Sequence, residues 1–356
     1  MNAKQHVYDL DRVALRECVP LDTPFLLLLE PTFNCNARCN YCLQASKREG
    51  LERRGLRFGS MEWDMFIEIV QQISDFPQKI KKVTLSGNGE PLLHKQLPDM
   101  VRLLRECGNV EKVLVVSNGT LLTPKLSDAL LDAGLQEMRI SLQGVTAEKY
   151  KEICGITINY DAFRENLRYF YERRNACLFK VKVADSALDD GDEERFYQLY
   201  GDICDYIGIE HIYTQFQGVD YSGNLREDNR KTRYGYDYAK LHVCSAQFFK
   251  LNVLWDGRIT LGYPDGIIFE GFNTSETTLS KVWNSPERLN FLLSHLKHDY
   301  SKRPECKTCT RWDNSILPTE MLDGHEAEII SRMPRQSYEE NTLRKHKVIC
   351  SNNEGC

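Results

Sequence analysis

The chain has 356 residues, of which 42% are hydrophobic and 27% are charged. This composition is typical of globular proteins and excludes disorder, collagen and coiled coil. The net charge is −5 and the pI is near 6.0, so the charge balance gives no reason to expect nucleic acid as a partner. The longest apolar run, residues 25–29, is far shorter than the roughly 18 residues of a membrane span. Residues 1–11 contain no signal-peptide stretch, so we expect a cytoplasmic protein without membrane association.

From residue 25 onward, short apolar and β-branched runs alternate with helix-period stretches, which predicts β-α units. Strands are expected at residues 25–30, 82–86, 112–117, 138–142, 179–183 and 207–213. Helices are expected between them at residues 61–75, 96–107, 123–134, 160–174 and 193–204. Such alternation favours a parallel sheet. An eight-unit barrel needs about 250 residues, so the stretch 25–214 fits a partial, TIM-like (β/α)6 barrel in an α/β protein.

After residue 240 the pattern changes, which indicates a smaller α+β domain. Short strands are expected near 248–255 and 257–262, and a helix at 279–297. The last forty residues are charged and irregular, with one expected helix near 323–333. We therefore predict four parts, namely an N-terminal segment, a barrel, a second domain and a tail, with bounds 1–24, 25–238, 239–316 and 317–356.

The chain has thirteen cysteines, an odd number, in a protein without a secretion signal. This argues against a disulfide framework and for metal or redox chemistry. Cys35, Cys39 and Cys42 lie within eight residues on the loop after the first strand. Three thiolates can hold three irons of a cubane cluster, and because such clusters usually take four cysteines, one iron is left open. Zinc is the competing metal, but it prefers four ligands, and no other cysteine or histidine lies nearby in the sequence.

The spacing CxxxCxxC, with Tyr41 before the last cysteine, resembles the signature of the radical S-adenosylmethionine (radical SAM) superfamily. The resemblance implies a [4Fe–4S] cluster whose open iron chelates the methionine part of S-adenosyl-L-methionine. It further implies that one electron cleaves this cofactor to a 5′-deoxyadenosyl radical, which takes a hydrogen atom from the substrate. The electron would come from an external reductant such as flavodoxin or ferredoxin.

A glycine-rich acidic segment after the second strand resembles the motif that meets the methionyl ammonium group in this superfamily. It contains Gly87, Gly89 and Glu90. Glycines permit close backbone approach, and the glutamate would accept a hydrogen bond from the cation. Taken alone, such a segment is more often a turn.

Two further segments match the superfamily in order. Ser117 and Asn118, after the third strand, resemble the segment that lines the cofactor's ribose and carboxylate. Ser141 and Gln143, after the fourth strand, resemble the ribose-contacting motif, although the superfamily often has aspartate where this chain has Gln143. Each segment alone would be read as a turn. Their succession at the ends of neighbouring strands favours a cofactor site.

A second cysteine set, Cys244, Cys306 and Cys309, follows the barrel. It resembles the twitch or SPASM-type extension of the superfamily, which normally binds one or two auxiliary iron–sulfur clusters. Gly262 stands where the pattern would have another cysteine. An auxiliary cluster would therefore keep an open or non-cysteine iron, or be completed by Cys350 or Cys356, or be lost in favour of a zinc knuckle or free thiols.

Two other groups are candidates for roles in catalysis or substrate binding. Cys154, if it faces the barrel mouth, could return a hydrogen atom to a substrate radical, as an epimerase requires; a buried thiol is more often simply a packing residue. Lys180 and Lys182 alternate with valines on the fifth strand, so one lysine side could face the barrel interior. A solvated position is the alternative for both lysines.

The prediction is a radical SAM enzyme of oxidoreductase or epimerase type. The resemblance implies two main substrate classes: small carbohydrates or aminocyclitols that are oxidised, epimerised or dehydrated, and ribosomally made peptides that are crosslinked or epimerised. Peptide maturases commonly carry a leader-binding domain before the barrel, and here only 24 residues precede the first strand. We therefore expect a small hydroxylated substrate, with a peptide as the alternative. A non-catalytic iron–sulfur protein for electron transfer or sensing is the second alternative.

Overall fold

The computed structural model describes residues 3–5, 12–216, 219–225, 231–261 and 267–334. Its centre is a ten-stranded sheet in the order β1-β7-β6-β5-β4-β3-β2-β8-β9-β10. Six parallel strands form the middle of this sheet, and they are β2 (Leu26–Leu29), β3 (Lys82–Leu85), β4 (Val113–Ser117), β5 (Glu137–Leu142), β6 (Leu178–Ala184) and β7 (Tyr206–Glu210). Each overlaps a strand predicted from the sequence, and the predicted α/β fold is confirmed.

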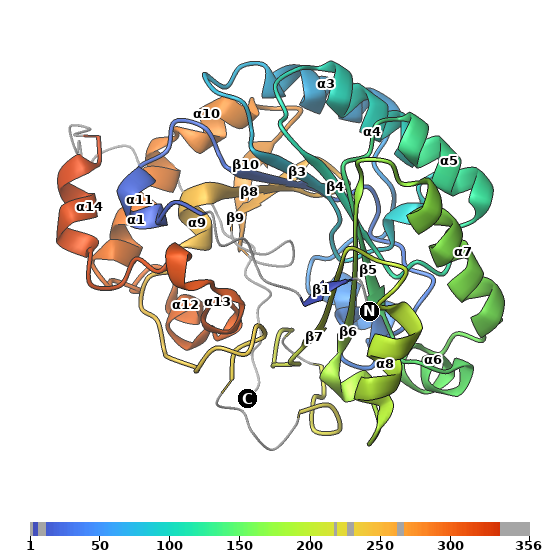
Figure 1. Ribbon diagram of the computed structural model, residues 1–356. Coiled ribbons are helices and arrows are strands. Elements are labelled where there is room, and N and C mark those ends of the chain that lie inside the picture. The colour runs from blue at the N-terminus through green and yellow to red at the C-terminus, as the bar shows by residue number, and fades with distance from the viewer. Residues whose placement is uncertain (1–2, 6–11, 217–218, 226–230, 262–266, 335–356) are drawn as a thin grey trace.

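The outer face of the sheet is covered by helices that form an arc in Figure 1. Five of them overlap the predicted ranges, and they are α3 (Trp63–Ile73), α4 (Leu97–Glu106), α5 (Pro124–Asp132), α7 (Tyr160–Arg173) and α8 (Asp192–Tyr200). Alternate strand residues such as Leu27, Leu29, Val181 and Val183 belong to the main core cluster beneath these helices. The other residues of each strand point to the opposite face, which we call the inner face.

Helix α6 (Ala147–Cys154) was not predicted. The Thr146 side chain caps its first turn by accepting a hydrogen bond from the Lys149 amide at 3.1 Å, and Gly155 ends it with a positive φ of 69°. Both are ordinary helix boundaries. The remaining short elements in this half are β1 (Lys4–Gln5), α1 (Leu15–Cys18), α2 (Arg48–Arg53), η1 (Leu43–Ala45), η2 (Pro91–Leu93) and η3 (Asp185–Ala187).

The C-terminal part continues the barrel sheet directly. β8 (Lys250–Val253) pairs in parallel with β2, with Leu26 opposite Lys250 and Leu29 opposite Val253. Antiparallel strands β9 (Arg258–Leu261) and β10 (Ile267–Asn273) then extend the sheet to its edge. The predicted strands near 248–255 and 257–262 are thus present, whereas β10 was not expected. At the other edge, β1 of the N-terminal segment pairs in parallel with β7.

The predicted single helix at 279–297 is wrong, because the chain forms two helices there. These are α10 (Leu279–Trp283) and α11 (Pro286–Leu296). Ser285 caps α11 by accepting from the Arg288 amide at 3.1 Å, and Pro286 takes the first helical position, where its missing N–H is not needed. A proline in the middle of one helix would have removed a hydrogen bond.

The last described elements are α9 (Ala246–Phe249), α12 (Pro304–Thr308), α13 (Arg311–Ser315), η4 (Pro318–Glu320) and α14 (Glu326–Arg332). Helix α14 falls within the predicted range, and its Ile329 joins a second core cluster with Leu15 of α1 and Leu292 of α11. Gly262, Cys350 and Cys356 lie outside the described residues. Within the described residues, every helix falls short of the length and apolar character that a bilayer crossing requires.

Candidate active site

The loop after β2 holds Cys35, Cys39 and Cys42 at the carboxyl end of the sheet, as predicted. The Ala37 amide donates to the Cys35 sulfur at 3.4 Å, and the Cys42 amide donates to the Cys39 carbonyl at 2.8 Å. A second attachment comes from α6, because the Arg38 amide donates to the Cys154 carbonyl at 2.9 Å. The loop is therefore fixed on both sides of its middle cysteine.

The three thiols lie close enough to affect one another's ionisation. Burial raises the pKa of Cys35 to about 12, and the nearby Glu90 carboxyl, Cys42 and Cys154 add to this rise. Contact with Cys154 and burial both raise the pKa of Cys39 well above its usual value. The unligated thiols of Cys35 and Cys39 are therefore protonated near neutral pH, and a metal that binds them must displace these protons.

The donor set of the cysteine loop consists of the three thiols of Cys35, Cys39 and Cys42. In an iron–sulfur cluster each thiolate binds a different iron, so three thiols can serve three irons of a cubane. The Ala37 amide donates a hydrogen bond to the Cys35 sulfur, and hydrogen bonds of this kind tune the reduction potential of iron–sulfur clusters. The donor set therefore fits a cluster.

The glycine-rich segment after β3 packs directly on the cysteine loop. A Cβ added at Gly89 would lie 2.1 Å from the Thr32 carbonyl oxygen and 2.6 Å from that of Asn34. One added at Gly87 would lie 2.5 Å from the Glu30 side chain. From the sequence we expected these positions to be glycine so that the backbone could approach the cofactor closely. In the structure, close contact with Glu30 and with the loop after β2 already requires glycine at both positions.

Glu90 joins three segments through its buried carboxylate and its backbone amide. Its Oε1 accepts from the Leu92 amide at 2.9 Å and from the Ser117 hydroxyl at 2.7 Å, and its Oε2 accepts from the Asn118 amide at 2.8 Å. The Glu90 amide itself donates to the Asn34 carbonyl at 2.8 Å. Burial raises the pKa of Glu90, against these hydrogen bonds.

Asn118 extends the connection back to the cysteine loop. Its side-chain amide donates to Asn36 at 2.9 Å, and its oxygen accepts from the Thr120 amide at 2.9 Å. Asn36 in turn donates to the Thr120 hydroxyl at 2.8 Å. Ser117 and Asn118 are thus brought together with the cysteines, as expected. Asn36 was not singled out from the sequence, where an exposed asparagine in a loop gives no distinct signal.

The segment after β5 reaches the same region from the other side. The Tyr41 hydroxyl donates to the Gln143 side-chain oxygen, and the side-chain amide of Gln143 donates to the Ser141 carbonyl at 3.1 Å. Gln143 is buried, while Ser141 is partly exposed on the inner face. The aromatic residue between the last two cysteines therefore contacts the residue that replaces the usual aspartate.

Cys154 lies at the end of α6 and is 1% exposed. Its thiol donates to the Tyr150 carbonyl at 2.9 Å, and contact with Cys39 lowers its pKa. The side chain thus packs against the cysteine loop. A role as hydrogen-atom donor stays a prediction, whereas the contact with Cys39 gives this residue a supporting position beside the cysteine loop.

Two buried groups near the site were missed or left open by the sequence. Glu30, directly after β2, is fully buried, and its Oε1 accepts from the Asn88 amide at 2.7 Å. Lys182 of β6 is 8% exposed, and its ammonium lies 2.5 Å from Glu210 of β7. A charged residue at the end of an apolar strand was the available signal for Glu30. The partner of Lys182 depends on strand register, which a single sequence does not contain.

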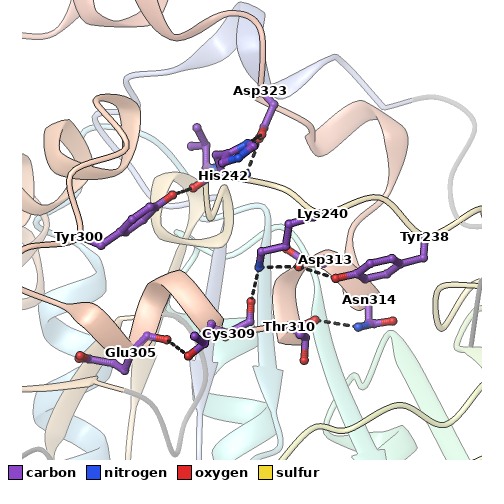
Figure 2. Close-up of polar contacts among 12 residues, drawn as sticks. Tyr238, Lys240, His242, Tyr300, Glu305, Cys309, Thr310, Asp313, Asn314 and Asp323 are labelled. Carbon is purple, nitrogen blue, oxygen red and sulfur yellow. Dashed lines mark hydrogen bonds and ion pairs between the residues drawn. The ribbon is translucent and has the colours of Figure 1, made fainter.

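The second cysteine set is also brought together. Burial raises the pKa of Cys244 to about 12, and the neighbouring Cys309 and Cys306 add to this rise. Figure 2 shows Lys240, which donates to the Cys309 carbonyl at 2.7 Å and to Asp313 at 2.8 Å. This ion pair ties the loop that carries Cys309 to α13. All eleven cysteines of the described residues carry free thiols.

The partial barrel and the cysteine loop together define an iron–sulfur enzyme. The family model for the radical SAM superfamily matches residues 29–181. The GTP 3′,8-cyclase of Limosilactobacillus fermentum is 30% identical in an alignment of length 261 that covers 64% of this chain and 76% of the relative. The chain therefore belongs to the radical SAM superfamily. It is a radical SAM enzyme, and its cofactors are a [4Fe–4S] cluster and S-adenosylmethionine.

Solved structures share the fold at low sequence identity. SuiB of Streptococcus suis bound to S-adenosylmethionine matches with a TM-score of 0.57 and 14% identity, covering 84% of this chain and 74% of SuiB. BtrN in complex with AdoMet and 2-DOIA matches with a TM-score of 0.50 and 18% identity, covering 80% of this chain and 92% of BtrN. These likenesses extend past the six-stranded barrel, and they support the fold alone.

Proposed function

We propose that Cys35, Cys39 and Cys42 bind the cluster and that the residues around Glu90 bind the methionine part of S-adenosylmethionine. The single observation that carries this proposal is the set of hydrogen bonds by which Glu90 joins the ends of β3 and β4 to the cysteine loop. When bound and reduced, the cluster supplies the electron that cleaves the cofactor and so generates the hydrogen-abstracting radical.

The protein's own residues position the cofactor and stabilise its charge. A carboxylate has about four acceptor positions, and three described donors already hold Glu90 in place. The methionyl ammonium would use the remaining capacity, and its positive charge would favour the ionised form that burial disfavours. Ser117 and Asn118 keep the carboxylate oriented, while Tyr41 and Gln143 close the opposite side.

We place a small hydroxylated molecule as the substrate, oxidised, epimerised, dehydrated or cyclised after loss of a hydrogen atom. The sequence relative acts, by its name, on GTP, which carries a hydroxylated ribose, so a nucleotide extends the predicted carbohydrate class. A ribosomally made peptide is the second candidate, since SuiB, a protein of the same fold, has also been solved bound to its precursor peptide SuiA. Flavodoxin or ferredoxin would supply the electron.

The experiment is the exchange of Glu90 for glutamine. In cluster-loaded protein without oxygen, E90Q should weaken binding of S-adenosylmethionine about tenfold or more, because a hydrogen bond to a charged group contributes about 1.5–3 kcal/mol. The readouts are cofactor affinity by calorimetry and 5′-deoxyadenosine formed after addition of dithionite. E106Q, which changes an exposed glutamate on α4, is the matched control. Unchanged cofactor affinity in E90Q, with wild-type cluster absorbance, would refute the assignment.

For the second domain we propose an auxiliary iron–sulfur cluster on Cys244, Cys306 and Cys309. Their mutual proximity and the Lys240–Asp313 ion pair that fixes the loop support it. Replacing Cys35, Cys39 and Cys42 together by alanine should leave iron and sulfide near one cluster per chain after reconstitution. The further change Cys306→Ala should remove this remainder. A triple variant that already lacks iron would show that the second set is empty.

A further inference from the structure

The inner face of the sheet carries a row of charged side chains beside the cofactor residues. On β6, Phe179, Val181 and Val183 belong to the helix-covered core, so Lys180 and Lys182 point to the inner face. The register places Arg139 of β5 opposite Lys180 and Ser141 opposite Lys182. Lys182 is therefore the sheet neighbour of a residue assigned above to the cofactor site.

Described ion pairs join five cations to two carboxylates of this face, Glu137 and Glu210, the fifth cation being Lys112 at 3.7 Å from Glu137. Lys182 lies 2.5 Å from Oε2 of Glu210, and Arg233 lies 2.5 Å from the same oxygen. Towards the amino ends of the strands, Glu137 lies 2.8 Å from Arg139 and 3.3 Å from Lys180. Burial raises the pKa of Glu137, but the cations Arg139 and Lys180 outweigh this effect and lower the pKa to about 2.

The cations nearest the cofactor residues repel one another. Burial, with the neighbouring guanidinium of Arg233, lowers the pKa of Lys182 to about 8, and Arg139 adds to this while Glu210 opposes it. Lys182 is 8% exposed, whereas the side chains of Arg139 and Arg233 keep 20% and 26% exposure. Buried charge of one sign is costly unless an opposite charge compensates it.

The register partner of Lys182 on β7 is Gly208, which has no side chain, so no β7 side chain stands directly beside Lys182 at that position. Arg233 reaches Glu210 from the loop after β7 with two donors on one carboxylate oxygen, at 2.8 and 2.5 Å. The Glu210 carboxylate thus fixes the ends of Lys182 and Arg233 side by side. Paired cationic donors of this kind suit an oxyanion.

We propose that Lys182, Arg233 and Arg139 form an anion-binding subsite for the substrate, which therefore carries a phosphate or carboxylate group. The subsite deepens the function proposed above by naming a substrate class, and it rests on that function for its role in catalysis. The anionic end would hold the molecule beside Ser141, so that its hydroxylated part faces the cofactor residues.

Binding of simple anions tests the subsite independently of cofactor cleavage. The probes are inorganic phosphate and acetate, titrated into oxygen-free, cluster-loaded protein with S-adenosylmethionine at constant ionic strength, with the melting temperature as the readout. At least one probe should raise the melting temperature of the wild type, and K182M should weaken its apparent affinity about tenfold. K182R should retain most of it. K125M, which changes an exposed lysine on α5, is the matched control.

The pH dependence separates a binding role from a structural one. Affinity for the probe should fall as the pH rises through about 8, because the ammonium of Lys182 then loses its proton; the groups facing it are Glu210, Arg233 and Arg139. K182M should lack this fall. A response to phosphate alone assigns a phosphoryl group, a response to acetate alone assigns a carboxylate, and a response to both supports the anionic class.

The proposal is overturned if neither anion shifts the wild type, or if K182M and K125M respond alike. If K182M does not fold, R233M replaces it in the same experiment. Arg233 is partly exposed, and in R233M the ion pair between Lys182 and Glu210 is retained. Formation of 5′-deoxyadenosine from S-adenosylmethionine distinguishes the two proposals: if it persists while anion binding fails, only the subsite is refuted.

Discussion

Glu30 lies at the junction of β2 and the cysteine loop, where it is fully buried from solvent. Its carboxylate accepts from the Asn88 amide, and its side chain fills the space that Gly87 leaves open. Burial raises the pKa of Glu30 from 4.5 to about 7, although backbone contacts at Asn88 and Trp255 oppose this rise. The folded protein therefore holds a proton on Glu30 at pH values where the unfolded chain has released it.

The consequence for stability follows from proton linkage. Between about pH 4.5 and 7 the folded state binds more protons at Glu30 than the unfolded state, so the stability contributed by this group falls as the pH rises. The difference between the two pKa values corresponds to a loss of about 3 kcal/mol in the free energy of unfolding above pH 7, relative to low pH. E30Q keeps an oxygen acceptor for the Asn88 amide and removes the charge.

We expect E30Q to be more stable than the wild type at pH 8 and close to it at pH 5. The measurement is the free energy of unfolding in urea at several pH values, with E106Q as a control that should show no such trend. Equal effects of E30Q at both pH values would mean that the carboxyl keeps an ordinary pKa in the folded protein.

At the scale of elements, the site consists of loops that are packed on one another. The glycine-rich segment fits against the Thr32–Asn34 backbone because Gly89 has no Cβ. Gln44 adds two donors from the cysteine loop's far end, to the Phe33 carbonyl at 2.7 Å and the Asn88 carbonyl at 2.9 Å. The two loops thus fold as one unit, and a change in either should disturb the other.

Much of this arrangement could be predicted, because its signals are local. The alternation of apolar strands and helix-period stretches marked all six central strands, and the spacing of Cys35, Cys39 and Cys42 marked the metal loop. The break between α10 and α11 was also visible as Ser285 followed by Pro286, a cap and a first-turn proline. The prediction of one helix over 279–297 did not take this boundary into account.

Other features depend on pairing between distant segments. The stretch around Phe248 to Trp255 was recognised as a strand, but nothing local to it specifies β2 as its partner. Likewise, the burial of Lys182 follows from the register of β6 with β5 and β7. Parallel pairing across long connections leaves no short-range trace in one sequence. The lysine–valine alternation marked Lys182 as a candidate, but its ion pair with Glu210 and its neighbours Arg139 and Arg233 emerged only from the structure.

At the scale of the whole molecule, barrel and extension share one sheet and one core. Leu251 and Val253 of β8, Leu279 of α10 and Trp283 belong to the same hydrophobic cluster as Leu27 of β2. A second cluster joins α1, α11 and α14 through Leu15, Leu292 and Ile329, among others. A chain whose parts share buried contacts so widely should unfold as a single cooperative unit, despite the two domains predicted from the sequence.

Two spectroscopic probes can test this cooperativity, because the tryptophans are unevenly placed. Of the four tryptophans, Trp255, Trp283 and Trp312 lie beyond residue 239, while most helices seen by circular dichroism surround the barrel. In oxygen-free urea titrations, tryptophan fluorescence and circular dichroism should give coincident transitions.

I329A, which truncates a fully buried side chain on α14, should lower the free energy of unfolding by about 2–5 kcal/mol and shift both transitions together. V13A removes an exposed apolar side chain near α1 and should shift neither by more than about 0.5 kcal/mol. If I329A moved only the fluorescence transition, the extension would be an independently folding domain docked on the barrel edge.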